Sequence, residues 1–285
     1  MENKYWNKRI STEQANRHQW VTAEPYLGRP GSVEKPSLAS VLADFTSINL
    51  GQMDAVALQD RIDTKYVFSV AQLRYTLPYL IEGYQVLEVA GQRMNHYRTL
   101  YFDTPDFGLY NMHVNGQAER YKVRSREYTD SQLTFLEVKH KTRKDRTIKA
   151  RITTDQALVR MTPAAEQWLN GLVPFNCRAL EPKIWNSFTR ITLVGKNSFE
   201  RVTIDLDVTF SSESKIVTLG GLAIAEVKLA WRGCPSSFVD LMHSQRIHPQ
   251  SFSKYCIGTS MLYEQVKKNS LKPQLLKINK IITGA

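Results

Sequence analysis

The chain has 285 residues, of which 42% are hydrophobic, and a formal net charge of +11. A chain of this length can bury one sizeable core, and no apolar run approaches the roughly 18 residues of a membrane-spanning helix. Cys177, Cys234 and Cys256 are far apart and form no CxxC pair or Cys/His spacing, which argues against a disulfide framework and a structural zinc site. We therefore expect a soluble cytoplasmic protein with an acidic partner, which charge alone does not identify.

The first part of the chain alternates loop, helix and strand signals. Weak periodicity and the loop-like EPYLGRPGSVEKP predict a mobile N-terminal arm over residues 1–37. Apolar residues at helical spacing predict helices over residues 37–58 and 72–81, with a strand, RIDTKYVFS, between them. Short strand candidates then follow at turn-separated intervals: YQVLEVA, HYRTLYFD, ERYKVRSREY, LTFLEVKHK and RTIKARI.

The second part adds longer strands and further helices. A helical pattern covers residues 154–172, another covers residues 235–245, and SFSKYCIGTSMLYEQV begins as a loop and turns helical. Three further strands are predicted in KIWNSFTRITLV, ERVTIDLDVTF and LAIAEVKL. Eight or nine strands at this spacing predict an α+β protein with a mainly antiparallel sheet or barrel and helices outside it. Residues 266–285 are expected to form a peripheral tail.

Cations alternate along the predicted strands. In ERYKVRSREY, Arg120, Lys122, Arg124 and Arg126 fall on one strand face, where like charges repel. Residues 120–151 contain eleven lysines and arginines against four carboxylates. A fold tolerates such a surface most easily if a polyanion fills it.

The same alternation recurs in other strands, where carboxylates lie among the cations. The aligned sets are Glu137, Lys139 and Lys141; Lys149 and Arg151; Arg201, Thr203, Asp205 and Asp207; and Glu226 and Lys228. In an open sheet these would be ordinary solvated faces. In a closed barrel they would line a basic tunnel, in which arginines bind phosphate oxygens and carboxylates hold a divalent cation. Repetition over six strands favours the tunnel.

At these strands the sequence resembles the VTC domain, the polyphosphate-polymerase branch of the triphosphate tunnel metalloenzymes (the CYTH-like group). The matching pieces occur in the family's order over about residues 58–265: RIDTKYVF, YRTLYFDTPDFGLY, RYKVRSREY, FLEVKHK, IKARI, FTRI, RVTIDLD, AEVKL and SFSKY. The resemblance implies an antiparallel β-tunnel, a closed barrel of about eight strands with helices packed outside, over residues 38–265. No phosphate-sensing (SPX) domain precedes the match, so we expect the bacterial stand-alone type.

The resemblance also implies an activity. Eukaryotic members of the family transfer the γ-phosphate of ATP to a growing polyphosphate chain with manganese or a similar divalent ion. We therefore expect a metal-dependent polyphosphate polymerase with Mn²⁺ or Mg²⁺ as cofactor and ATP and polyphosphate as partners. One departure is Ser251, where eukaryotic members tend to have a basic residue just before the F-S-K-Y element.

Site residues follow from the matched positions. The matched phosphate contacts are Lys65, Arg124, Arg126, Lys139, Lys149, Arg190, Arg201 and Lys254, with Ser253 beside the last. All of these except Lys65, Ser253 and Lys254 are expected to be catalytic. The charge alternation adds further substrate-binding candidates: Arg61, Arg120, Lys122, Lys141, Arg151 and Lys228. Glu226 occupies the position of the metal carboxylate, and further candidates for metal or water contacts are Asp205, Asp207 and Glu137.

Two other functions remain open. A tunnel triphosphatase would cleave inorganic or nucleoside triphosphates, but such hydrolases present several glutamates in an ExExK strand, where this chain has Arg61-Ile62-Asp63-Thr64-Lys65. A non-catalytic polyphosphate-binding module would bind without turnover. Nucleic acid is not expected, because inward-facing charges leave no room for a duplex. The sequence does not determine the oligomeric state, the product length, the direction of the reaction or a membrane protein that could anchor the chain.

Overall fold

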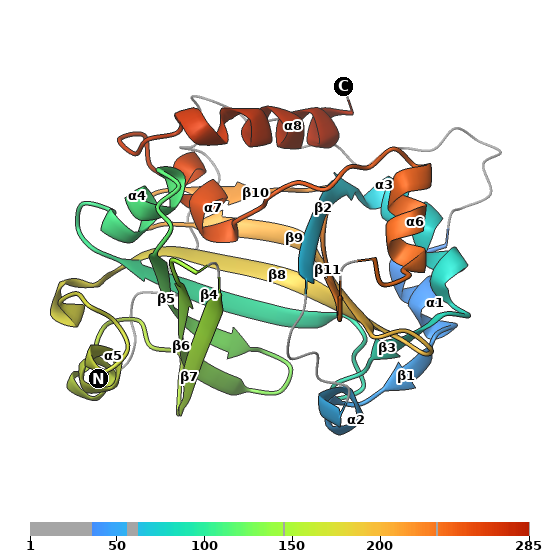
Figure 1. The fold of residues 1–285 in the computed structure, drawn as a ribbon, viewed down its shortest axis with the longest axis horizontal. Coiled ribbons are helices and arrows are strands. Elements are labelled where there is room, and N and C mark those ends of the chain that lie inside the picture. Colours follow the sequence, from blue (N-terminus) through green and yellow to red (C-terminus); the bar gives the residue numbers. More distant parts are fainter. Residues whose placement is uncertain (1–35, 56–61, 145, 232, 285) are drawn as a thin grey trace. The chain divides into compact units, whose positions relative to one another are not determined.

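A computed structural model describes residues 36–55, 62–144, 146–231 and 233–284, so most of the predicted N-terminal arm and Arg61 lie outside the described residues. The described part is built on one mainly antiparallel sheet of eleven strands (Figure 1). The strands are β1 (Thr46–Ile48), β2 (Ile62–Ser69), β3 (Tyr84–Leu87), β4 (Asn95–Asp103), β5 (Arg120–Tyr128), β6 (Leu133–Lys141), β7 (Thr147–Thr154), β8 (Glu181–Gly195), β9 (Glu200–Ser211), β10 (Ile216–Thr218) and β11 (Leu222–Leu229).

Helices pack around this sheet. They are α1 (Leu38–Ala43), α2 (Leu50–Ala55), α3 (Val70–Thr76), α4 (Gly108–Val114), α5 (Pro163–Asn170), α6 (Ser237–Ser244), α7 (Lys254–Leu262) and α8 (Lys272–Thr283), with short 3₁₀ turns η1 (Leu77–Leu80), η2 (Cys177–Ala179) and η3 (Asn269–Leu271). In Figure 1, α1, α3 and α6 gather beside one end of the sheet, whereas α7 and α8 lie along another side. None of the described helices is long and apolar enough to cross a membrane.

The strands are paired in an open path. Their order is β2-β11-β9-β8-β4-β5-β6-β7, and β1, β3 and β10 pair outside this path. Among the described strands no ladder joins β7 to β2, so the expected closed barrel is not confirmed. Residues of both end strands nevertheless line one cavity, Lys65 on β2 and Lys149 on β7. The sheet therefore curves around this cavity without closing.

Strand alternation separates a core face from a cavity face. On β9, Val202 and Ile204 are fully buried in a core cluster that also contains residues of α1, α3 and α6, while Arg201 and Thr203 line the cavity. A second cluster lies under α4, α7 and α8, and a third joins β4, β5 and β6 to α5. On the central strands of the sheet the apolar residues thus pack under helices and cationic residues face the hollow side, whereas Ile148 and Ile152 of the edge strand β7 are exposed.

Three predicted segments differ in the structure. The helix predicted over residues 37–58 is interrupted by β1, and α2 starts after Asn49, whose side-chain oxygen accepts from the Gln52 backbone N–H at 2.9 Å. Of the helix predicted over residues 154–172, only α5 is helical, and Thr154 belongs to β7. The predicted peripheral tail contains α8, and its Ile278 is 1% exposed within the second core cluster.

A close helix–sheet contact provides a test of this packing. A methyl group on Gly258 of α7 would lie 2.5 Å from the Phe210 ring and 2.9 Å from Ile184. We expect Gly258→Ala to lower the free energy of unfolding by about 1–3 kcal/mol, because overpacking outweighs the gain in helix propensity. Denaturant unfolding measures this. Gly83→Ala is the control, since nothing lies within 4 Å of its added methyl; an equal effect of both substitutions would contradict the packing.

Candidate functional site

The hollow side of the sheet contains a strongly cationic cavity of about 640 Å³. Its lining includes eleven lysines and arginines against four carboxylates. The cations are Lys65, Lys122, Arg124, Arg126, Lys139, Lys149, Arg151, Arg190, Arg201, Lys228 and Lys254. Such a concentration of like charge is unfavourable in an enclosed space unless carboxylates or a bound anion offset it.

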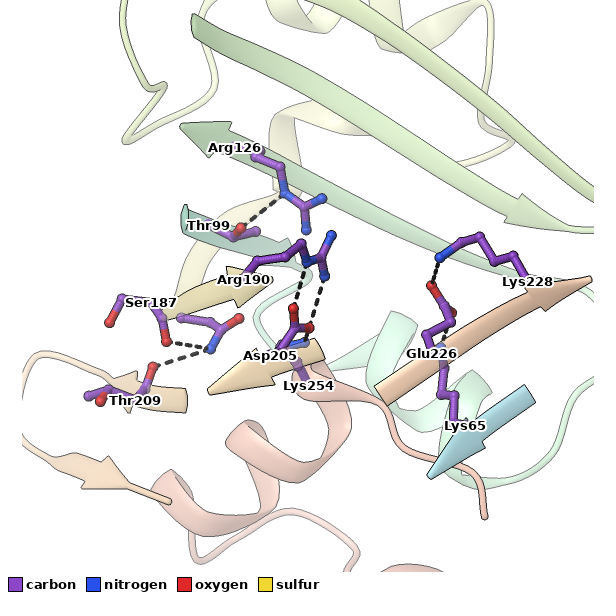
Figure 2. A network of polar contacts seen from close by, with 11 residues as sticks. Lys65, Thr99, Arg126, Ser187, Arg190, Asp205, Thr209, Glu226, Lys228 and Lys254 are labelled. Carbon is purple, nitrogen blue, oxygen red and sulfur yellow. Dashed lines mark hydrogen bonds and ion pairs between the residues drawn. The ribbon is translucent and has the colours of Figure 1, made fainter. Parts of the chain in front are cut away.

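Glu226 on β11 holds two of these cations. Lys228 Nζ donates to Glu226 Oε2 at 2.5 Å, and Lys65 Nζ donates to Oε1 (Figure 2). The strand register explains this arrangement, because Lys65, Glu226 and Thr203 are directly opposite one another on β2, β11 and β9. Burial, and then the charges of Lys228 and Lys254, lower the pKa of Lys65 to about 7.

Asp205 on β9 holds a second pair. Arg190 donates through Nε to Oδ1 at 2.5 Å and through Nη2 to Oδ2 at 2.8 Å, and Lys254 also donates to Oδ2 (Figure 2). Although burial alone would raise it, these two cations hold the pKa of Asp205 well below its usual value. Both Asp205 oxygens are therefore occupied by cations, which it positions at the cavity wall.

The β5 cations have a different environment. Arg124 Nε donates to Glu137 Oε2 at 2.6 Å, so Glu137 orients Arg124. Arg126 is 8% exposed, and its Nε donates to the hydroxyl of Thr99 at 3.2 Å. Burial and the nearby charge of Arg124 lower the pKa of Arg126. A buried guanidinium beside like charge is well suited to a phosphate ligand.

The start of α7 adds a further anion-binding element. Ser253 caps this helix by accepting from the Cys256 backbone N–H at 3.2 Å, and it also accepts from Lys122 Nζ at 2.9 Å. Ser253 and Lys254 both line the cavity, so the positive end of the α7 dipole lies at its wall. Lys254 also lies over the Phe188 ring at 4.4 Å.

Most of the predicted site residues line this cavity, and four of those that the structure describes do not. Arg120 donates to the Gln117 carbonyl oxygen, and neither it nor Lys141 is part of the lining. Glu137, which accepts a hydrogen bond from Arg124, is not part of the lining either. Asp207 is exposed, which corrects its prediction as a cavity residue: the register shifts between Ser187 and Thr189, and Asp207 has a φ of 52°. The bulge breaks the alternation that would have placed Asp207 beside Asp205. Arg61 is not described.

Sequence analysis assigned no role to three uncharged members of the lining. Thr192, Thr203 and Asn95 line the cavity, and the side-chain oxygens of Thr203 and Asn95 are buried without a hydrogen-bond partner among the described residues. Thr203 could have been found, because it lies between Arg201 and Asp205 in the alternating pattern. No comparable signal exists for Asn95.

The carboxylates can be tested as metal ligands from their geometry. No group of three or more His, Cys, Asp or Glu side chains is close enough to hold a metal in the described part of the chain. Glu226 lines the cavity directly opposite Thr203, whose hydroxyl has no hydrogen-bond partner among the described residues. A divalent ion held by one carboxylate, with substrate phosphates as its other ligands, fits this donor set.

The Asp205 clamp provides a test of the cavity electrostatics. We expect Asp205→Asn to lower the free energy of unfolding by about 3 kcal/mol, because Arg190 and Lys254 lose their common counter-charge in a buried site. Chemical denaturation measures this. Glu166→Gln is the control, since its partner Arg178 is 82% exposed and such pairs contribute about 1 kcal/mol or less. Equal stability of both variants would contradict the role given to Asp205.

Comparison with known proteins gives a family. Two solved structures of candidate cyclases are similar to this chain. One is a candidate adenylate cyclase from Vibrio parahaemolyticus: the identity is 14%, the match covers 70% of this chain and 99% of that chain, and the TM-score is 0.43. The other is a candidate adenylyl cyclase from Hippeastrum with a dominant triphosphatase activity: the identity is 11%, the match covers 72% of this chain and 98% of that chain, and the TM-score is 0.43. Both similarities are distant. No curated protein matches the chain. Residues 60–263, most of the chain, match the VTC domain, and the chain belongs to that family.

Proposed function

We propose that the protein is a polyphosphate polymerase that transfers the γ-phosphate of ATP to a growing polyphosphate chain. One observation carries this proposal: eleven cations, contributed by strands across the whole sheet and by α7, line a single cavity. Because these cations come from several strands and from α7, a linear polyanion can contact several of them at once. The membership in the VTC domain family supports the same substrate class.

Residue roles follow from the contacts. Arg124, Arg126 and Lys139 bind the ATP triphosphate, and Asp205 keeps Arg190 and Lys254 oriented toward the phosphate chain. The terminal oxyanion of the polyphosphate attacks the γ-phosphorus, a new P–O bond forms, the bond to the β-phosphate oxygen breaks, and ADP leaves. Phosphoryl transfer depends mainly on such positioning and charge stabilisation.

Glu226 is the residue that we propose to hold Mn²⁺ or Mg²⁺. A divalent ion held by Glu226 would offset part of the phosphate charge. In the structure both Glu226 oxygens accept from Lys65 and Lys228. We therefore propose that these two lysines turn from Glu226 to the phosphates when substrate and metal are present.

Hydrolysis of a triphosphate in the same cavity is the second candidate. Water attack requires an activating base, and typical tunnel hydrolases present several glutamates on the strand that corresponds to β2. Here the described cavity residues of β2 are Asp63 and Lys65. This composition favours a phosphate chain over water as the acceptor.

The activity assay tests the proposal directly. With ATP and Mn²⁺ we expect ADP and an acid-stable polymer, and Glu226→Gln and Lys139→Ala each to lower the rate at least ~100-fold through loss of charge stabilisation. Lys280→Ala, an exposed lysine of α8, is the matched control. Circular dichroism checks the fold of each variant.

Each outcome of this assay has a distinct meaning. Release of orthophosphate alone identifies a triphosphatase. Tight binding of polyphosphate without any turnover identifies a binding module. If turnover survives both Glu226→Gln and Lys139→Ala, the cavity is not the reaction site.

The pH dependence of binding provides an independent test. Enclosure in the cavity, and then the charges of Lys122 and Arg124, lower the pKa of Lys139 to about 8. A bound phosphate chain favours protonated Lys139, so binding takes up a proton once the free lysine has lost it. Affinity for polyphosphate should therefore fall as the pH rises through about 8, in addition to the fall that Lys65, with a pKa of about 7, causes at lower pH.

Calorimetry in two buffers of different ionisation enthalpy measures this proton uptake. Lys139→Arg should remove the part of the pH dependence that lies around pH 8, because a guanidinium remains charged throughout this range, and should leave the part due to Lys65. Constant affinity of the wild type between pH 7 and pH 9 would rule out the linkage.

A further inference from the structure

One end of the cationic cavity is apolar. Leu50 and Met53, one helical turn apart on α2, line it together with Leu87 at the end of β3 and Val89 just beyond. Met53 and Val89 pack against a small buried cluster that contains Leu87. Leu50 remains 41% exposed. Phosphate gains nothing from such a wall, so its exposed part favours a ligand that has an apolar group beside its phosphates.

A buried hydrogen-bond acceptor lies beside this apolar wall. Asn95, the first residue of β4, lines the cavity and is 5% exposed. Its side-chain nitrogen donates to the Gln92 carbonyl oxygen at 3.0 Å, and that oxygen also accepts from the Val89 backbone N–H at 2.9 Å. The Asn95 amide is therefore fixed next to Val89. Its oxygen is buried and accepts no hydrogen bond from the described residues.

Cations begin directly next to Asn95. In the pairing of β4 with β8, Asn95 is opposite Arg190, which places their Cβ atoms roughly 4.5–5.5 Å apart. Arg190 is itself held by Asp205, on the next strand. The cavity thus changes, across two neighbouring strands, from an apolar wall with one free acceptor to a phosphate-binding wall.

We infer that this end of the cavity binds the adenine base of the donor nucleotide. We call Leu50, Met53, Val89 and Asn95 the base subsite. The flat apolar faces of the base contact Leu50, Met53 and Val89, and the Asn95 oxygen accepts a hydrogen bond from the exocyclic amino group. The inference rests on the proposed function only in taking ATP as the donor, whose phosphates then extend toward Arg190.

The chemistry of Asn95 predicts a preference among nucleotides. Adenine presents an amino group, which donates, where guanine presents a carbonyl oxygen, which accepts. Guanine would place two acceptors against each other in a buried site, and a buried group that loses its partner is costly. The base subsite should therefore favour adenine over guanine by roughly 10-fold.

Direct binding tests this without requiring turnover. Calorimetric titration of the full chain uses the β,γ-imido analogues of ATP and GTP, and inorganic tripolyphosphate, which has no base. We expect the ATP analogue to bind roughly 10-fold more tightly than the other two ligands. Asn95→Ala and Leu50→Ser should each weaken the ATP analogue several-fold and leave tripolyphosphate unchanged. Leu276→Ser, at a leucine that is 64% exposed on α8, is the control and should change neither.

The outcomes separate this inference from the proposed function. Equal affinities of the three ligands for the wild type, or an equal loss of tripolyphosphate and ATP analogue in Asn95→Ala, would overturn the base subsite. Neither result depends on whether polymer is made. Conversely, a clear adenine preference in a protein that releases only orthophosphate would support the subsite while removing the polymerase proposal.

Discussion

Repulsion among the cations of one cavity is the constraint on which the arrangement of this protein depends. Three carboxylates limit it: Glu226 holds two lysines, Asp205 holds an arginine and a lysine, and Glu137 holds Arg124. The cations outnumber these partners, and burial together with this excess of positive charge lowers the pKa values of Lys65 and Lys139. The cavity thus keeps an excess of positive charge, which favours a phosphate-rich ligand.

The cationic faces could be predicted from the sequence because strand alternation is local. Arg124 and Arg126, or Glu226 and Lys228, share a face wherever an undisturbed strand forms, and the structure places all four of these residues in the cavity lining. The long strands β5, β6, β9 and β11 were recognisable for the same reason. The family match added the order of these strands, which alternation alone does not contain.

The remaining features depend on contacts that no local pattern records. A bulge between β8 and β9 turns Asp207 to the surface although it shares the parity of Asp205. The role of Asp205 itself depends on Arg190 and on Lys254, which comes from a distant helix. Asn95 has no charge and no repeated spacing, and it becomes notable only because Gln92 and Val89 hold its amide at the cavity wall. The absence of pairing between β7 and β2 is likewise a property of the whole sheet.

We propose that the cavity accommodates a phosphate chain that is longer than one triphosphate group. Affinity as a function of chain length tests this most directly, by calorimetric titration of the protein with tripolyphosphate and with longer linear polyphosphates of defined length, compared at equal phosphate concentration. We expect affinity to rise with the length of the polyphosphate. Lys149→Ala, on the edge strand β7, should remove much of this gain and change the binding of tripolyphosphate little. Equal affinity per phosphate for all lengths, with Lys149→Ala without effect, would contradict this proposal.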